Sequence, residues 1–185
     1  MATQDLSTQA TRQFATFFVD GLFFGIDVLE VQEVLRYQEM TRVPLAPEVI
    51  EGLINLRGQI VTAIDMRRRL KLRPRTDGRT PMNTVVRTEE GAVSLLVDEI
   101  GDVIAVDADT FERAPDNLNP EARELLQGVY KQKDRLLLIL DTKKTIGFAG
   151  GAQKSRQALQ SGPEAAETGA MAARAVQSAV ACPRI

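Results

Sequence analysis

Histidine and tryptophan are absent from this sequence of 185 residues, and Cys182 is its one cysteine. The lack of histidine excludes Ser–His–Asp catalysis, Cys–His catalysis and metal sites built on imidazole. One cysteine cannot form a disulfide within the chain, which fits a reducing compartment such as the cytosol. No stretch approaches the roughly 20 apolar residues of a membrane span, and the polar segment Met1–Gln13 lacks the apolar run of a signal peptide. We therefore expect a soluble, cytoplasmic protein.

Motifs of enzymes are missing as well. The stretch Gly147–Ser155 vaguely suggests a phosphate-binding loop, but Ala152-Gln153 stands where that motif needs glycine directly before Lys-Ser or Lys-Thr. Carboxylates are abundant, yet nothing in the sequence pairs two of them as a general acid and base. We therefore expect no catalytic residue, no metal site, no cofactor and no enzymatic activity.

The charge is nearly balanced, with 23 Lys and Arg against 25 Asp and Glu. A domain that binds nucleic acid in bulk is usually strongly basic, so this balance argues against that function. Seven basic residues nevertheless gather between Arg67 and Arg79, and Pro74, Gly78 and the following Pro81 break the block. We expect a solvated loop there. The alternative is an SH3-like barrel that binds RNA through residues 67–79, but this loop lacks the aromatic residues that stack on bases.

Segments rich in β-prone residues occur in pairs around turn residues. Asp20-Gly21 separates residues 14–19 from 22–26, and Glu89-Glu90-Gly91 separates residues 84–86 from 92–97. Such pairs predict β-hairpins. The strand–turn–strand pattern of residues 14–34 recurs weakly at 84–104, which suggests two similar small β modules.

A third hairpin is predicted around Arg57-Gly58. Residues 60–64 are rich in β-branched side chains, Gly52 opens the segment, and Gly58 can adopt the positive φ of a turn. A buried hairpin does not need a cation at its tip. Arg57 is therefore either a solvated turn residue or a group that binds a partner.

Other elements are predicted with less regular patterns. Residues 28–36 have apolar positions that suit a short helical turn or an irregular strand. Pro47–Gly52 suits one helical turn, and Asn119-Pro120-Glu121 predicts the start of a short helix that ends at Gly128. Residues 135–140 are expected to form the last buried strand. After residue 148 aromatic residues vanish, and we expect a flexible or weakly helical tail.

Six segments of the chain resemble the bacterial chemotaxis coupling protein family CheW. The similarity covers about residues 13–148, with Thr62-Ala63 and Met66 as small departures from the family pattern. The segments that carry it are Val31–Val34, Thr41–Pro44, Ile50–Val61, Ile64–Arg67, Leu96–Ile100 and Asp134–Asp141.

The resemblance implies an all-β fold with a few short helices, in which two five-stranded SH3-like β-barrels share a core. It agrees with the two modules suggested by the repeat. We expect a flexible segment at 1–12, a CheW-like domain at 13–148 with a rough boundary between the barrels near residue 80, and the tail at 149–185.

The resemblance also implies an adaptor that is recruited to membrane-associated receptor arrays. Its expected partners are the regulatory domain of the histidine kinase CheA and the cytoplasmic tip of methyl-accepting chemoreceptors, with membrane contact only through the receptors and no nucleic acid. A coupling protein of a surface-motility or gene-control pathway is the alternative. A CheV-like protein or a detached kinase regulatory domain would need more chain than the tail provides.

Five residues match family positions at which partners bind. Arg57 and Glu33 are the expected charged contacts, Val31 and Val34 are apolar positions beside that glutamate, and Asn55 belongs to the same motif. Burial in the core is the alternative for the two valines, and an internal ion pair is the alternative for Glu33 and Arg57. Three glycines are expected to be structural turn residues: Gly21, Gly52 and Gly58.

Overall fold

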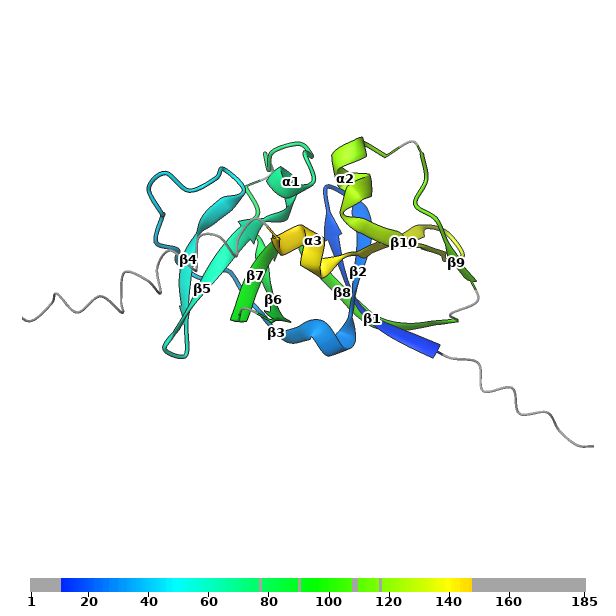
Figure 1. The fold of residues 1–185 in the computed structure, drawn as a ribbon, viewed down its shortest axis with the longest axis horizontal. Helices are drawn as coiled ribbons and strands as arrows, with labels where there is room; N and C mark the ends of the chain where they lie inside the picture. Colours follow the sequence, from blue (N-terminus) through cyan, green and yellow to red (C-terminus); the bar gives the residue numbers. More distant parts are fainter. Residues whose placement is uncertain (1–10, 77, 90, 108–109, 117, 148–185) are drawn as a thin grey trace, which may run out of the picture. The chain divides into compact units, whose positions relative to one another are not determined.

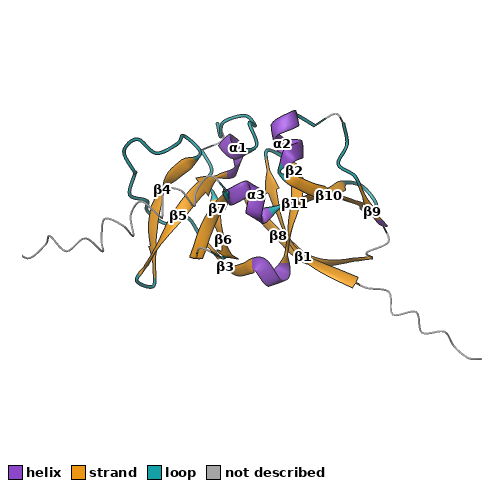
Figure 2. Ribbon diagram, viewed as in Figure 1, coloured by secondary structure: helices purple, strands orange, loops and turns teal. Residues whose placement is uncertain are grey.

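The computed structural model describes residues 11–147, except 77, 90, 108–109 and 117, and places eleven strands there in two sheets (Figure 1). Three of the short helices in the described part lie between strands, and the fourth follows the last strand (Figure 2). The expected all-β fold with a few short helices is confirmed. Residues 1–10 and 148–185 lie outside the described part, and they include the expected tail and most of the expected N-terminal segment.

The first sheet has the strand order β8-β1-β2-β11-β10-β9, and its neighbours are antiparallel except for the parallel pair β2 and β11. A sixth strand, β9, of two residues adds to the five that were expected. The strands are β1 (Thr11–Val19), β2 (Leu22–Asp27), β8 (Glu99–Asp107), β9 (Phe111–Glu112), β10 (Leu126–Lys131) and β11 (Leu136–Leu140).

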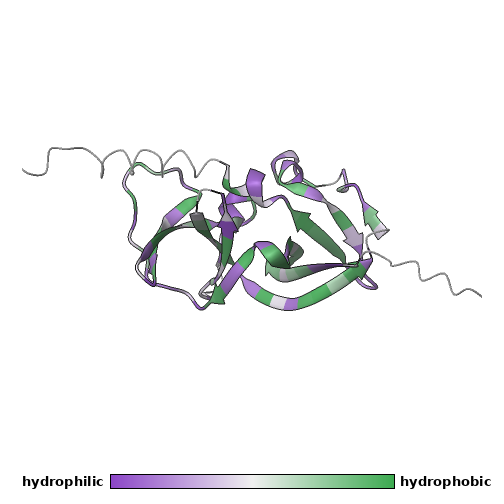
Figure 3. Ribbon diagram, turned by 60° about the horizontal axis from the view of Figure 1, so that its bottom comes forward, coloured by the Kyte–Doolittle hydropathy of each residue, from purple (hydrophilic) through white to green (hydrophobic). Residues whose placement is uncertain are grey.

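The second sheet has the order β3-β6-β7-β5-β4, with β5 and β7 parallel. The segment after β3 returns to β4, where Thr41 and Leu53 exchange two backbone hydrogen bonds of 2.9 Å. This pairing closes the sheet into the ring seen in Figure 3. The strands are β3 (Val31–Leu35), β4 (Ile50–Leu56), β5 (Gln59–Asp65), β6 (Met82–Thr88) and β7 (Gly91–Val97).

Gly52 is needed where the second sheet closes, and its expected role as a turn residue is wrong. It lies inside β4 next to a register shift, and a Cβ atom there would come within 2.8 Å of the Thr41 carbonyl oxygen and 3.0 Å of the Met40 side chain. Glycine therefore allows close backbone approach at this point.

Two connections cross between the sheets. The chain leaves the first sheet after β2 and returns to it after β7, through the 3-10 helix η1 (Val28–Glu30) and through Asp98 respectively. The chain therefore does not divide at one boundary near residue 80, which falls inside the segment of the second sheet. The order of elements explains why the two modules share a core.

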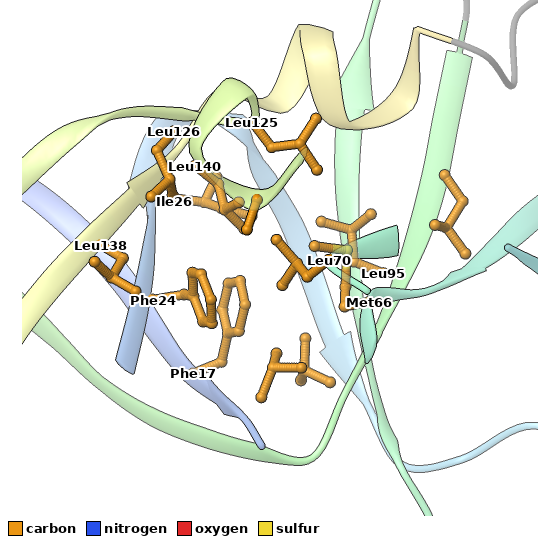
Figure 4. Close-up of a cluster of buried hydrophobic side chains, with 14 of the residues drawn as sticks. Phe17, Phe24, Ile26, Met66, Leu70, Leu95, Leu125, Leu126, Leu138 and Leu140 are labelled. Carbon is orange, nitrogen blue, oxygen red and sulfur yellow. The ribbon is translucent and has the colours of Figure 1, made fainter. Parts of the chain in front are cut away.

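That shared core lies between the sheets. Phe17 and Phe24 of the first sheet pack with Leu95 of β7 and with Met66 and Leu70, all of them almost fully buried (Figure 4). Two smaller clusters lie within the individual sheets, one around Phe14 and Tyr130 in the first and one around Ile54 and Val85 in the second. Burial of this apolar surface is the main stabilising contribution to the fold.

Two hairpin turns form as the sequence predicts. Asp20 and Gly21 have φ angles of 50° and 77°, and Arg57 and Gly58 have 51° and 87°. Positive φ at both central residues is the requirement of the tight turn that matches the twist of antiparallel strands. Gly21 and Gly58 are therefore turn residues, as expected.

Several short elements differ from the prediction. Residues 28–35 form both expected alternatives in succession, η1 and then β3. Pro47–Gly52 is not helical: the Ile50 amide bonds the Pro47 carbonyl at 2.8 Å in a turn, and β4 follows. Helix α2 (Pro120–Glu124) starts after the Asn119 cap as predicted but ends before Gly128, which belongs to β10 and lies against Phe111.

The basic block is not one solvated loop. Its first part is helix α1 (Met66–Arg69), and Arg69 donates hydrogen bonds to carbonyl oxygens of Lys144 and Thr145 in α3 (Thr142–Ile146) at 2.8 and 2.9 Å. Arg67 and Arg75 have side chains only 12% and 16% exposed. The expectation of a solvated tip is wrong for these arginines because carboxylates of the folded chain bind them.

Asp98 is the centre of this ion-pair network, which we call the junction network (Asp20, Asp65, Arg67, Arg75 and Asp98). The Asp98 carboxylate accepts hydrogen bonds from Arg67 Nε at 2.9 Å, Arg75 Nε at 2.8 Å and the Asp20 amide at 2.7 Å. Arg75 Nη1 also pairs with Asp65 at 3.0 Å. The network thus joins the β1–β2 turn of the first sheet to elements of the second.

Candidate functional site

An ion pair lies at the tip of the β4–β5 hairpin. Arg57 Nη2 donates to Glu33 Oε2 at 3.0 Å, so the hairpin turn is joined to β3. The Arg57 side chain is 80% exposed, whereas that of Glu33 is 15% exposed. The structure brings together the two charged residues that the sequence singled out. The Arg57 side chain points outward. It also forms the ion pair with Glu33 that was the alternative interpretation of these two residues.

The position of Glu33 explains its low exposure. In the register of β3 and β6, Glu33 lies opposite Val85, whose side chain belongs to the inner cluster of the second sheet. Directly opposed residues share a face of the sheet. The carboxylate therefore lies at the edge of an apolar interior, and the guanidinium of Arg57 partly covers it.

The backbone of Arg57 is in an unfavourable conformation. A φ of 51° places this long side chain in the left-handed region, which asparagine, aspartate and glycine adopt at lower cost. Backbone strain of this kind costs on the order of 1 kcal/mol and gathers at functional positions. The turn does not require arginine, so the side chain itself is the feature that needs an explanation.

Asn55 supports the turn. Its Oδ1 accepts a hydrogen bond of 2.9 Å from the Gly58 amide, which ties the strand end to the glycine of the turn. Asparagine side chains commonly bond the backbone in this way at turns. The structure thus shows Asn55 as a residue that orders the hairpin tip and keeps Arg57 in place.

The two valines of β3 have different surroundings. Val31 is partly buried and packs against the shared core, so its alternative interpretation as a core residue is supported. Val34 is 41% exposed and lies next to Glu33 in the chain. Because side chains alternate along a strand, Val34 points to the outer face of β3, opposite to Glu33, and forms exposed apolar surface there.

Two more exposed apolar residues were missed by sequence reasoning. Ile60 lies opposite Asn55 in the β4–β5 register and is largely exposed, and Leu29 in η1 is exposed as well. Both belong to apolar runs, and the runs alone predict burial. Ile60 could have been found from its position two residues after Gly58, since hairpin tips extend beyond the core.

The geometry suits recognition of another protein more than chemistry on a small molecule. No group of three or more Asp, Glu, His or Cys residues that could hold a metal ion occurs in the described ranges. A depression of about 430 Å³ lies beside the closure of the second sheet, where Arg68 and Glu51 pair at 2.7 Å. We assign no cofactor to it.

The two sheets with their shared core agree with the expected pair of SH3-like barrels. The family model of the CheW-like domain matches residues 13–148. The chemotaxis protein CheW of Bacillus subtilis is 32% identical over 130 residues, which cover 70% of this chain and 83% of that protein. CheW of Klebsiella aerogenes is 30% identical over 135 residues, covering 73% and 81%.

A solved structure is also similar. The scaffolding protein TtCheW from Thermoanaerobacter tengcongensis matches with a TM-score of 0.65 and 27% identity, covering 72% of this chain and 86% of that one. The chain belongs to the CheW-like family, and its function is that of a chemotaxis adaptor or scaffold. None of the helices in the described part has the length and apolar character needed to cross a bilayer.

Proposed function

We propose that this chain couples the cytoplasmic tips of methyl-accepting chemoreceptors to the regulatory domain of the histidine kinase CheA, and that it does so without catalysis of its own. The observation that carries the proposal is the strained, exposed Arg57 paired with Glu33 at the hairpin tip. An arginine on a rigid turn loses little entropy when it binds a carboxylate of a partner.

The Arg57–Glu33 pair can open, so that Arg57 binds a carboxylate of a partner in place of Glu33. Within the described residues, Arg57 uses one donor for Glu33 and leaves its other donors directed to solvent. An exposed ion pair contributes at most about 1 kcal/mol to stability, so a partner carboxylate can compete for the guanidinium. Val34 and Ile60 are exposed apolar residues of the same sheet, and such surface is desolvated at the centre of interfaces.

The surroundings of the basic block support a protein partner over nucleic acid. Arg67 and Arg75 are bound to carboxylates of the chain itself, so the block presents fewer free cations than its sequence suggests. We propose that the protein acts in the cytoplasm and reaches the membrane only through the receptors. The receptors that it binds identify the pathway that it serves, whether flagellar, surface-motility or gene-control.

The direct test is reconstitution of receptor, CheA and this protein. Full-length chain should join a receptor cytoplasmic fragment to CheA in a pull-down and place kinase activity under receptor control. Arg57→Asn should reduce that coupling, because asparagine keeps the turn and removes the guanidinium. Arg87→Asn, a change at another exposed arginine of the second sheet, is the matched control. Coupling that both variants retain in full would overturn the assignment of Arg57.

A further inference from the structure

A second candidate binding site lies on the first sheet, away from the Arg57 hairpin. A depression of about 400 Å³ is lined by Phe23, Ile104 and the β10–β11 turn, residues 132–135. Phe23 and Ile104 belong to, or pack against, the inner apolar cluster of this sheet. The depression therefore opens onto an apolar floor. Ligands commonly bind in concave sites that combine apolar lining with a few polar groups.

Arg135 covers this floor in an ordered position. Its guanidinium carbon lies 4.3 Å from the centre of the Phe23 ring and 5.6 Å from that of Phe18, and the two rings are 4.9 Å apart. The Gln132 amide bonds the Arg135 carbonyl at 2.9 Å and closes the turn. Stacking on aromatic rings holds the planar group and leaves its N–H edge available.

The charges at the rim are not neutralised by the rest of the structure. Neither Arg135 nor Lys133 has a hydrogen-bond or carboxylate partner among the described residues, in contrast to Arg67 and Arg75 of the junction network. Asp134 between them leaves the turn with an excess of one positive charge. An ordered guanidinium without an acceptor, next to the half-buried Ile104, is complementary to a carboxylate beside an apolar side chain.

We propose that this site docks a short acidic peptide segment of a protein partner. An apolar side chain of the segment contacts Ile104 beside the stacked Arg135, and a neighbouring carboxylate accepts hydrogen bonds from Arg135. A peptide segment is favoured over a small inorganic anion because its apolar side chain can also cover Ile104, which an ion would leave open to solvent. The site is on the first sheet, so it does not depend on the Arg57 contact.

The test uses the full chain labelled with ¹⁵N and the peptide acetyl-Glu-Leu-Glu-amide as the probe. Saturable shifts are expected in the amides of residues 131–136 and of Phe23 and Ile104. The neutral peptide acetyl-Gln-Leu-Gln-amide should bind at least about tenfold more weakly, a difference of about 1.4 kcal/mol. Arg135→Leu should abolish binding, Arg135→Lys should restore it in part, and Arg57→Asn should leave it unchanged.

Three outcomes would overturn the proposal. The first is the absence of saturable shifts at about 10 mM peptide, a concentration that detects even millimolar affinity. The second is equal binding by Arg135→Leu with a wild-type melting temperature. The third is full competition by inorganic phosphate at equal concentration, which would define a simple anion site. Because the probe contains neither receptor nor kinase, its failure leaves the Arg57 coupling experiment unaffected.

Discussion

Two groups of arginine–carboxylate pairs in this molecule have the same chemistry and different surroundings. In the junction network, Asp98 binds two arginines and a backbone amide where side chains are mostly covered. At the hairpin tip, Arg57 makes one bond to Glu33 and is 80% exposed. Buried pairs become costly when one partner is lost, whereas exposed pairs contribute little. The first group therefore serves the fold, and the second is free to serve binding.

The largest expected effect is on the junction network. Asp98→Asn should lower the free energy of unfolding by about 3 kcal/mol, because Arg67 and Arg75 would remain covered without their main charge partner. Urea unfolding followed by circular dichroism measures it. Asp116→Asn removes the almost fully exposed carboxylate that pairs with Arg123 and is the matched control, with a change of less than about 0.5 kcal/mol. A loss below about 1 kcal/mol for Asp98→Asn would mean that the junction network contributes no more to stability than an exposed ion pair does.

The pH dependence of stability sharpens the same comparison. Burial by itself raises the pKa of Asp98, but the hydrogen bonds and charges of Arg67, the Asp20 amide and Arg75 outweigh it and hold the pKa below its usual value. A lowered pKa in the folded state means that the stabilisation is present above the ordinary pKa of about 4 and is lost as the pH falls through the lowered value.

Asp98→Asn should therefore flatten the loss of stability in acid below about pH 4, by at most about 1.4 kcal/mol per pH unit. Unfolding curves measured between neutral pH and strong acid for both proteins give the slopes. Parallel acid slopes for the unchanged chain and Asp98→Asn would show that the network does not set the acid sensitivity.

The two valines of β3 test whether a covered residue stabilises the fold while an exposed residue on the same strand binds a partner. Val31→Ala should cost about 1 kcal/mol of stability, since it removes part of a side chain that packs on the shared core. Val34→Ala should change stability by less than about 0.5 kcal/mol and should weaken partner binding. Thermal melts and a pull-down on both variants measure the two effects. A reversed order would place Val34 in the core and Val31 in the interface.

The smallest effect is expected from the tail. Deletion of residues 149–185 should leave the melting temperature within a few degrees, because this segment contains no aromatic residue to contribute to a core. Calorimetry of the truncated and full-length chains compares them directly. A large fall in melting temperature would mean that the tail packs on the domain and that the fold does not end near residue 148.

Features set by neighbouring residues could be predicted from the sequence. The Asp20-Gly21 and Arg57-Gly58 turns and the cap at Asn119 depend on backbone preferences within a few residues. The family resemblance supplied the paired barrels, which local patterns indicated only as two similar modules. The position of Arg57 at an exposed tip followed from the same local signals.

Features that depend on contacts between distant residues could not be predicted from the sequence. Gly52 has its role because Thr41 returns to β4, and the pattern around Gly52 carries no sign of that return. Arg67 reaches Asp20 and Asp98, which lie far from it in the chain, so the basic block looked solvated. The spacing of Val31 and Val34 suited both a helix and a strand, and only the packing distinguishes the covered side chain from the exposed one.

The central claim is that the hairpin tip serves binding and not stability, and Arg57→Asn tests it most directly. Asparagine tolerates the positive φ of the turn, so the substitution removes the guanidinium without adding strain. On the same preparation, urea unfolding gives stability and titration with CheA or a receptor fragment gives affinity. We expect affinity to fall about 30-fold, or about 2 kcal/mol, while the unfolding free energy changes by less than about 0.5 kcal/mol. Lower stability with unchanged affinity of the folded fraction would contradict the account.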